Sequence, residues 1–284
     1  MQYFVNQTIG VIIPTFNRVN LLSRALDSVY AQTLTPDAVL VVDDGSSDGT
    51  REFIRHNYPD VIYLYQSNSG VSAARNSGIK NSTCTWLAFL DSDDEWLPQK
   101  LELQFAALQQ NPGYSLVHSD EIWIRRGVRV NQRDKYQKRG GYIFDRCLPL
   151  CAISPSSVLM SRQLLLEMDG FDESMPACED YDLWLKVCCR YPVLYIDQPL
   201  LRKYGGHQDQ LSTTHWGIDR FRVQALDKLL NSTALTPEQS QMSKAMLIQK
   251  CQILSDGASK RGNAESVEYY RRLMRKYSDN QQEA

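Results

Sequence analysis

The chain lacks any apolar run of the roughly 18 residues that a membrane span needs. Its first residues, MQYFVNQTIGVIIPTFNR, also lack a basic segment followed by an apolar stretch of about 7–15 residues, the pattern of a signal peptide. These two absences predict a protein that is neither secreted nor inserted in a membrane. We expect it in the cytoplasm, with peripheral contact at the inner face of the membrane as a further option.

A strong charge excess and paired cysteine motifs are absent as well. The 284 residues carry a formal net charge of −2, with 43% hydrophobic and 23% charged residues, as in an ordinary soluble globular protein. This balance does not call for nucleic acid as a partner. The seven cysteines form no CxxC pair, and an odd number cannot all pair within one chain, so reduced thiols are expected.

The first two thirds of the chain alternate between two kinds of segment. Stretches with helical spacing of apolar residues, such as Thr50–Asn57 and Lys100–Gln109, separate short apolar runs rich in β-branched and aromatic residues. This alternation predicts an α/β protein with a mainly parallel central sheet flanked by helices. The runs that predict strands are Val11–Pro14, Val39–Val42, Val61–Tyr65, Trp86–Leu90, Ser115–His118, Val158–Met160 and Val193–Ile196.

The last quarter of the chain contains helical patterns alone, from about Ile218 onward. Thr236 and Pro237 predict the cap and first residue of a long helix, and Ala264–Tyr277 predicts another. We therefore divide the chain into an α/β domain at residues 1–215 and a helical C-terminal extension at residues 216–284.

Polar residues directly follow four of the predicted strands. In an open parallel sheet the ligand binds beyond the carboxyl ends of the strands, so these segments form the candidate site. Turns and helix caps are the alternative explanation, because Asp, Ser and Gly favour both. The four segments are Pro14–Arg18, Asp43–Thr50, Asn68–Gly70 and Asp91–Asp94.

The segment Asp91–Asp94 brings three carboxylates to one edge of the sheet. Their mutual repulsion is costly unless a cation is present. Hard divalent ions such as Mg²⁺ and Mn²⁺ bind carboxylate oxygens and leave positions open for substrate phosphates. This pattern predicts a metal site beside a diphosphate, and a solvated acidic helix start is the alternative.

Five segments, read in order, resemble one enzyme family: PTFNR, VVDDGSSDGT, NSGVSAARNSGI, FLDSDD and CEDYDLWLK. They resemble the inverting glycosyltransferases of family 2, which have the GT-A (nucleotide-diphospho-sugar transferase) fold. The resemblance implies metal-dependent transfer of a sugar from a nucleotide-sugar donor, usually a UDP-sugar, to an acceptor hydroxyl. It also implies Mn²⁺ or Mg²⁺ as cofactor, a glycan or lipid-linked acceptor, and a place in surface polysaccharide or glycan biosynthesis.

The resemblance further assigns residues to the donor nucleotide. Asp43 matches the aspartate that reads the base, usually uracil, and Asp44 belongs to the same pocket. Arg75 matches a residue near the diphosphate and ribose. The full set implied for the donor is Pro14, Thr15, Asn17, Arg18, Asp43, Asp44, Arg75, Asp91 and Ser92.

The metal ligands implied by the resemblance are Asp93, Asp91 and His207, with Asp94 in support. His207 resembles a histidine that approaches the metal or diphosphate from a C-terminal loop in many relatives. A single histidine is more often structural or exposed, and that is the alternative. The loop of this chain, Lys203-Tyr204-Gly205-Gly206-His207, also lacks the arginine that commonly stands two residues before that histidine.

Asp180 matches the aspartate that acts as general base in the family. The chemistry needs such a group, because an acceptor hydroxyl must lose its proton as it attacks the anomeric carbon opposite the departing nucleotide. The alternative is that Glu179, Asp180 and Asp182 complement the positive end of the helix that they begin. Both roles are compatible.

Two other classes of function compete with this hypothesis. A nucleotidyltransferase would carry a glycine-rich phosphate loop after the first strand, which Pro14–Arg18 is not. A non-catalytic nucleotide-sugar-binding module has no chemical need for Asp93 or Asp180.

The sequence leaves the role of two basic segments undecided. The hairpin region Arg125–Arg139 is either solvated or contacts an anionic acceptor or phosphate, and Arg271–Lys276 is either an exposed helix face or touches an anionic membrane.

Overall fold

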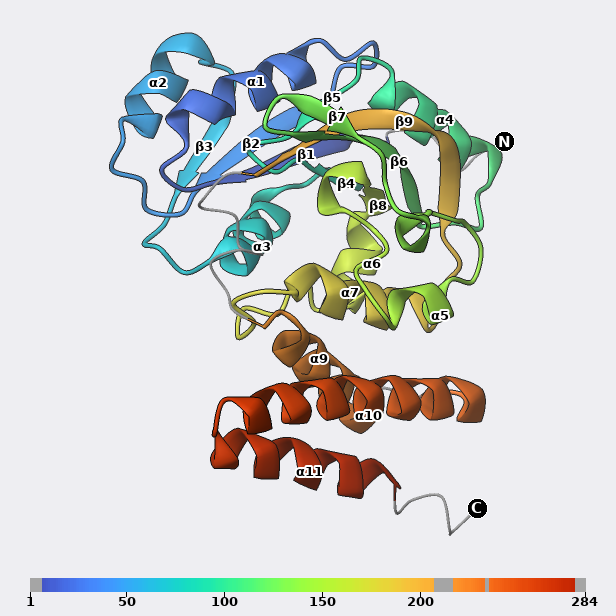
Figure 1. Ribbon diagram of the computed structural model, residues 1–284. Coiled ribbons are helices and arrows are strands. Elements are labelled where there is room, and N and C mark those ends of the chain that lie inside the picture. The colour runs from blue at the N-terminus through green and yellow to red at the C-terminus, as the bar shows by residue number, and fades with distance from the viewer. Residues whose placement is uncertain (1–6, 207–216, 233–234, 279–284) are drawn as a thin grey trace.

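The computed structural model describes residues 7–206, 217–232 and 235–278. Within these residues a nine-stranded sheet has the order β3-β2-β1-β4-β8-β6-β9-β5, with β7 paired to β6. Helices cover both faces of the sheet, and three further helices extend from one side of the molecule (Figure 1).

The first four strands of the chain form the parallel half of the sheet. They are β1 (Ile9–Thr15), β2 (Ala38–Asp43), β3 (Ile62–Tyr65) and β4 (Trp86–Phe89). Every residue of β1 is buried, so both faces of this strand are covered. The covering helices are α1 (Val19–Tyr30) and α2 (Thr50–Asn57) on one face and α3 (Val71–Asn81) on the other (Figure 1).

Neighbouring residues of β1 belong to opposite cores, because successive side chains of a strand point to opposite faces. Ile13 packs in the hydrophobic cluster that contains Leu22 of α1, and Ile12 packs in the cluster that contains Ile79 of α3. A parallel strand that is buried on both faces reads as a continuous apolar run. The strand at Val11–Pro14 was predicted from such a run.

The second half of the sheet is mixed. The strand β8 (Leu159–Ser161) runs antiparallel to both β4 and β6 (Leu116–Arg125), while β9 (Leu194–Gly205) is parallel to β6. Two short strands, β5 (Glu95–Trp96) and β7 (Val128–Val130), pair antiparallel with β9 and β6. The four strands β1 to β4 share one direction with β6 and β9, so the sheet is mainly parallel, as predicted.

The strands β6 and β9 are longer than predicted, since the apolar runs Ser115–His118 and Val193–Ile196 cover only their first parts. Their ladder continues past a β-bulge to Arg125 and Gly205. Main-chain hydrogen bonds do not depend on apolar side chains, so the pattern of the sequence did not reveal this continuation. The predicted turn at Arg126-Gly127 is present, and both residues have positive φ, as in a tight hairpin.

The remaining helices of the domain pack around the second half of the sheet (Figure 1). They are α4 (Lys100–Gln110), α5 (Phe144–Cys147), α6 (Arg162–Glu167) and α7 (Glu179–Cys188), with short 3₁₀ turns at Asp134–Tyr136 and Pro155–Ser157. Trp96 and Trp184 are buried. All seven cysteines are free thiols.

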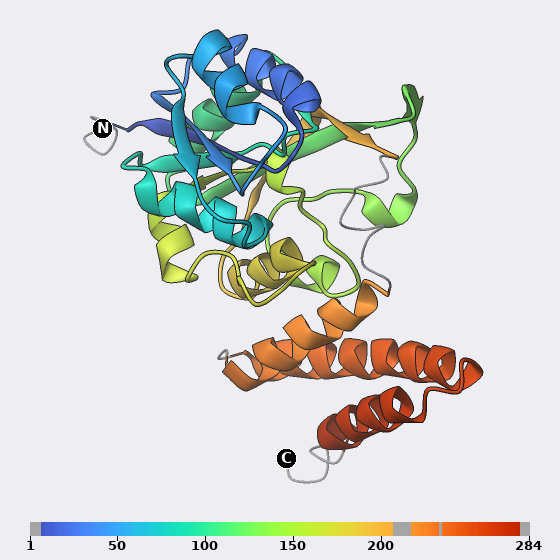
Figure 2. The same cartoon turned by 90° about the vertical axis from the view of Figure 1, so that its left-hand side faces the viewer.

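The C-terminal extension consists of α9 (Asp219–Ser232), α10 (Pro237–Lys260) and α11 (Ala264–Ser278). Thr236 caps α10, as predicted, and the structure shows that it does so in a capping box with Gln239. The helix α9 lies between α7 and the pair α10–α11 (Figure 2). Leu226 of α9 and Leu247 of α10 belong to the same hydrophobic cluster as α7, so the extension shares a core with the domain. The predicted boundary after residue 215 falls outside the described residues.

No helix among the described residues is both long enough and apolar enough to span a lipid bilayer.

Candidate active site

A cavity of about 700 Å³ opens at the carboxyl ends of β1 and β4. Five parts of the chain that are far apart in sequence form its walls: the loops that follow the parallel strands, the segment around Cys151 and Pro155, the start of α7, the end of β9, and the first turn of α9. It contains the residues Pro14, Thr15, Asn17, Arg18, Asp44, Arg75, Asp91, Ser92, Asp93 and Asp180 from the predicted site, together with Cys151, Cys178, Lys203, Ile218 and Arg222.

The loop after β1 is tied to the loop after β2. The backbone N–H of Asn17 donates to Ser46 Oγ at 2.8 Å, and the backbone N–H of Ser47 donates to Asn17 Oδ1 at 2.8 Å. Asn17 itself has a φ of 51°. Residues 14–18 thus form one rigid wall of the cavity, and the hydroxyl of Thr15 is buried there without a hydrogen-bond partner among the described residues.

The adjacent carboxylates Asp43 and Asp44 lie in different places. Asp44 lines the cavity and accepts the backbone N–H groups of Ser69 and Gly70, at 2.9 and 2.8 Å, which fixes the turn before α3. Asp43 is buried beneath that wall and does not line the cavity. Its two oxygens accept the N–H of Ser46 at 2.8 Å and the hydroxyl of Tyr63 at 2.6 Å.

The three carboxylates after β4 have different partners. Asp91 Oδ1 forms an ion pair with Nη2 of Arg75 at 2.8 Å, and Asp93 Oδ2 forms one with Nη1 of Arg18 at 3.1 Å. Burial and the neighbouring Asp91 raise the pKa of Asp93, which reports the expected repulsion between these carboxylates. Asp94 is buried and serves the fold, because its oxygens accept the hydroxyl of Ser156 at 2.7 Å and the backbone N–H of Tyr204 at 3.0 Å.

Arg75 joins the strand end at β4 to the start of α7. Its guanidinium is buried, contacts Asp91 through Nη2 at 2.8 Å, and contacts Glu179 through Nη1 at 2.6 Å. The ring of Phe171 lies 5.0 Å below it. Burial opposes its charge, yet Asp91 and Glu179 raise its pKa further, so it stays cationic.

The three carboxylates in the first turn of α7 point in different directions. Glu179 points to Arg75, while Asp182 is buried and pairs with Lys186 and Lys228, each at 3.2 Å. Asp180 lines the cavity and forms no ion pair among the described residues, although its charge helps to raise the pKa of Lys203, which lines the same cavity. Its oxygens accept the backbone N–H of Tyr181 at 2.7 Å and the thiol of Cys151 at 3.0 Å.

Lys203 on β9 was not among the predicted site residues. Its ammonium group reaches the cavity and donates to Ser154 Oγ at 2.7 Å. Burial opposes its charge, but the carboxylates Glu121, Asp94 and Asp91 raise its pKa. The sequence offered one signal, since Lys203 begins the segment that departs from the family pattern. Cys151, Cys178 and Arg222 carried no signal, because only the packing of α7 and α9 brings them to the cavity.

His207, which the resemblance implies as a metal ligand, lies outside the described residues. Among the residues that are described, no group of three or more His, Cys, Asp and Glu side chains is arranged to hold a metal ion. The implied set Asp91, Asp93 and His207 therefore stays a prediction.

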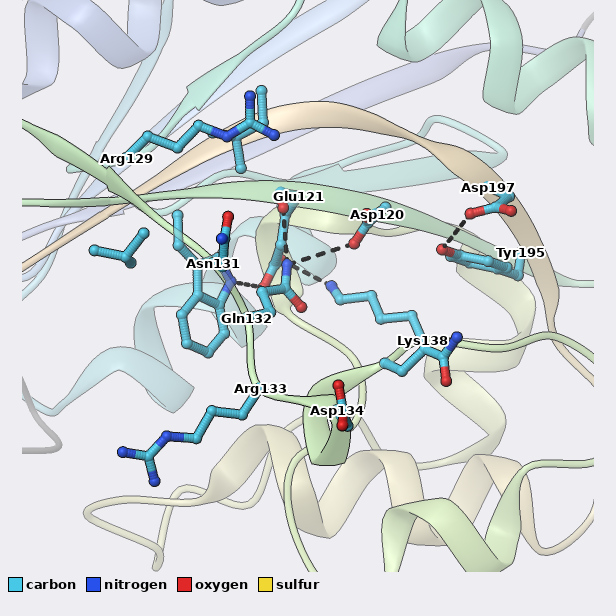
Figure 3. A pocket seen from close by; sticks show the side chains of 14 residues that line it. Asp120, Glu121, Arg129, Asn131, Gln132, Arg133, Asp134, Lys138, Tyr195 and Asp197 are labelled. Carbon is cyan, nitrogen blue, oxygen red and sulfur yellow. Dashed lines mark hydrogen bonds and ion pairs between the residues drawn. The ribbon is translucent and has the colours of Figure 1, made fainter.

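A second cavity of about 480 Å³ lies beside the β6–β7 hairpin, in the region of the basic segment Arg125–Arg139 (Figure 3). Lys138 points to Glu121 and pairs with it at 2.8 Å, with both side chains buried (Figure 3). Burial alone would raise the pKa of Glu121. The charge of Lys138 is the main cause that instead lowers this pKa to about 2. Acidic residues such as Asp120 and Asp197 also line this cavity, so its charge is mixed.

The substitution Lys138→Met should destabilise the protein by about 3–5 kcal/mol, because it leaves the Glu121 carboxylate buried without its main cation. Urea unfolding of the purified protein measures the effect. Because the lowered pKa of Glu121 stabilises the native state above the usual pKa of about 4.3, the parent should lose this contribution as the pH falls toward 2. Adding Glu121→Gln to Lys138→Met should recover much of the loss, and a double variant no better than Lys138→Met would contradict the assignment.

Comparison with known proteins gives a family match. Residues 10–165 match the family described as Glycosyl transferase family 2. An uncharacterized glycosyltransferase of Rickettsia felis is 31% identical over 225 residues, which is 76% of this chain. The chain spans only 36% of the length of that relative.

One relative has a specific name. It is the UDP-Glc:alpha-D-GlcNAc-diphosphoundecaprenol beta-1,3-glucosyltransferase WfgD of Escherichia coli, which is 31% identical over 181 residues, 63% of this chain and 69% of WfgD.

Two solved structures share the fold. S. aureus TarS 1-349 in complex with UDP-GlcNAc superposes with a TM-score of 0.72 at 17% identity, covering 98% of this chain and 93% of the TarS chain. The mannosyltransferase PcManGT from Pyrobaculum calidifontis, in complex with GDP-Man and Mn²⁺, gives a TM-score of 0.59 at 17% identity, over 96% of this chain and 85% of that chain. These likenesses confirm the predicted GT-A fold.

Proposed function

The chain belongs to glycosyl transferase family 2, and we propose that it transfers a sugar from a UDP-sugar to an acceptor hydroxyl with inversion at the anomeric carbon. The observation that carries the proposal is the cavity itself. Asp180, a carboxylate that forms no ion pair among the described residues, lines the same cavity as the acidic strand end Asp91–Asp93. One wall suits a general base, and the other suits a divalent cation that would hold a diphosphate.

In this proposal Asp180 is the general base. Its carboxylate accepts the proton of the acceptor hydroxyl while the oxygen attacks the anomeric carbon, and the nucleoside diphosphate leaves on the opposite side. The thiol of Cys151 and the backbone N–H of Tyr181 hold the carboxylate in the cavity. A single displacement of this kind inverts the anomeric configuration.

The acidic residues Asp91 and Asp93 fit a divalent cation, Mn²⁺ or Mg²⁺, with His207 as the further ligand in the proposed set. Arg75 contacts only Oδ1 of Asp91, and Arg18 contacts only Oδ2 of Asp93, so the second oxygen of each carboxylate lies outside these ion pairs. Carboxylate oxygens are the ligands that these hard cations prefer. A bound cation would neutralise charge that develops on the diphosphate leaving group.

We place the donor nucleotide at the loops after β1 and β2, which form a different wall of the cavity from α7. We assign the nucleotide to the cavity-lining residues Pro14, Thr15, Asn17, Arg18, Asp44, Arg75, Asp91 and Ser92, and to Asp43, which is buried beneath the wall and does not line the cavity in this structure. A uridine nucleotide is supported by the names of two similar proteins, since WfgD uses UDP-Glc and the TarS structure holds UDP-GlcNAc. The acceptor in the name of WfgD is a sugar on a lipid diphosphate, which supports a glycan or lipid-linked acceptor here.

Selectivity for uridine is the prediction that concerns Asp43. Each oxygen of Asp43 accepts one hydrogen bond and has a further lone pair, so it can accept the imide N–H of uracil, which cytosine lacks. UDP should therefore bind at least about tenfold more tightly than CDP, and Asp43→Asn should remove most of that difference. Isothermal titration of both nucleotides with each protein measures it, and equal affinity of the parent for UDP and CDP would refute the assignment.

Turnover tests the proposed function as a whole. UDP-, GDP- and dTDP-sugars should be incubated with the protein and Mn²⁺, and both donor hydrolysis and thermal stabilisation should be measured. A ligand that binds only the native state stabilises it by RT ln(1 + [L]/Kd), so weak donors become visible at high concentration. We expect a UDP-sugar to stabilise and to be hydrolysed slowly. Stabilisation without any turnover would favour a binding module. The absence of both stabilisation and hydrolysis would reject the proposal.

A further inference from the structure

The C-terminal extension contributes a cation to the cavity. Ile218 and Arg222, at the start of α9, line the cavity together with Cys178 and Asp180, at the start of α7. The helix α9 packs directly against α7, as the two views agree (Figures 1 and 2). The extension therefore completes one wall of the proposed active site.

Arg222 lies on the side of the cavity where α7 begins. The backbone carbonyl of Ile218 is 3.8 Å from the thiol of Cys178, the residue before α7, and the Arg222 guanidinium is 5.9 Å from the ring centre of Tyr181. Asp180 stands between Cys178 and Tyr181 in the same turn. Arg222 thus lines the same side of the cavity as the proposed base, where the acceptor hydroxyl must lie.

A network from the extension holds Arg222 in this position. Its Nη1 contacts Asp219 Oδ1 at 2.9 Å, and the same oxygen accepts Lys250 of α10 at 2.9 Å. Lys250 also donates to the carbonyl of Pro149 at 2.9 Å, which anchors α10 to the domain. Two cations share one carboxylate here, so Arg222, Lys250 and Asp219 together carry a net charge of +1.

The guanidinium of Arg222 has hydrogen-bond donors that its protein partners do not use. It carries five N–H groups, of which Asp219 accepts one from Nη1; Nε is buried and has no hydrogen-bond partner among the described residues, so the donors left for a ligand are on the Nη atoms. Its side chain is 23% exposed, so a ligand in the cavity can reach it. A planar guanidinium with a surplus positive charge matches the oxygens of a phosphate group, to which it can donate two parallel hydrogen bonds.

We propose that Arg222 binds a phosphate group of the acceptor and so positions the acceptor hydroxyl at Asp180. The inference rests on the proposed function and names the class of acceptor: a phosphate-bearing one, either a lipid-linked sugar diphosphate or a glycan phosphate. It also gives the helical extension a role in substrate recognition. The donor diphosphate is assigned elsewhere, to the walls that carry Arg18 and Arg75.

Binding of two acceptor-like probes in the presence of saturating UDP and Mn²⁺ tests the proposal. Decyl diphosphate represents a lipid-linked phosphate, and sorbitol 6-phosphate represents a phosphate on a polyol. The parent should bind at least one of them by isothermal titration, and the tighter probe identifies the source. Arg222→Gln should weaken that binding at least about tenfold, whereas Arg222→Lys should lose less because it keeps the charge but not the planar fork.

The controls separate this proposal from its alternatives. Arg220→Gln removes an arginine from the same turn of α9 at a position that does not line the cavity, so its probe affinity should equal that of the parent. UDP affinity should be unchanged in Arg222→Gln, and its melting temperature shows whether the extension stays in place. The proposal is overturned if the parent binds UDP but neither probe, if a probe binds only when UDP is left out, or if folded Arg222→Gln binds the probe as the parent does. A parent that does not bind UDP rejects the proposed function instead.

Discussion

The substitution Asp180→Asn should slow sugar transfer at least about 10²-fold while the affinity for donor and metal stays close to that of the parent. Asparagine is nearly isosteric with aspartate but cannot accept the proton of the acceptor hydroxyl. Within the described part of the chain the carboxylate accepts two hydrogen bonds, from Tyr181 and Cys151, so packing should survive the change. The loss should therefore appear in the chemical step and not in binding.

Single-turnover transfer, with donor affinity measured separately, distinguishes lost chemistry from lost binding. The matched control is Asp182→Asn, in the same turn of α7. Asp182 pairs with Lys186 and Lys228 outside the cavity, so this control should lower stability and leave the rate of transfer near that of the parent. Near-parental transfer by Asp180→Asn, or a greater loss of rate in Asp182→Asn, would move the base to another carboxylate.

The second large effect is expected from Asp93→Ala, which should abolish the increase in UDP affinity that Mn²⁺ produces. Removal of a direct carboxylate ligand should cost more metal affinity than loss of an outer partner, which typically costs about 10–100-fold. Asp93 lies at the cavity wall and pairs only with Arg18 through its side chain among the described residues, so the fold should tolerate alanine. Titration of UDP with and without Mn²⁺ gives the measurement.

Asp94→Asn is the matched control for Asp93→Ala. Both oxygens of Asp94 accept protein donors, from Ser156 and Tyr204, so its loss should lower the melting temperature and keep the Mn²⁺ effect on UDP affinity. If Asp93→Ala keeps the full Mn²⁺ effect, then Asp93 is not a ligand. If only Asp94→Asn loses the Mn²⁺ effect while it stays folded, the metal site lies at the neighbouring carboxylate.

Local patterns in the sequence predicted much of the fold. The buried run at Val11–Pro14, the helix at Thr50–Asn57 and the helix cap at Thr236 all appear as expected, because strand burial, helical spacing and caps depend on neighbours within a few residues. The same reasoning brought the segments Pro14–Arg18 and Asp91–Asp94 to one edge of the sheet. Both now line the same cavity.

The sequence by itself determined the order of the strands and helices, the kinds of residue at the strand ends, and the family to which they belong. Only the tertiary structure decided which of these polar groups share the cavity. It separates Asp44 from Asp43 and Asp180 from Asp182, and it adds Arg222 from a helix that is distant in sequence. The physical reason is that the direction of a side chain follows from the partners that long-range packing supplies, such as Tyr63 for Asp43 and Lys228 for Asp182, and spacing along the chain contains no record of those partners.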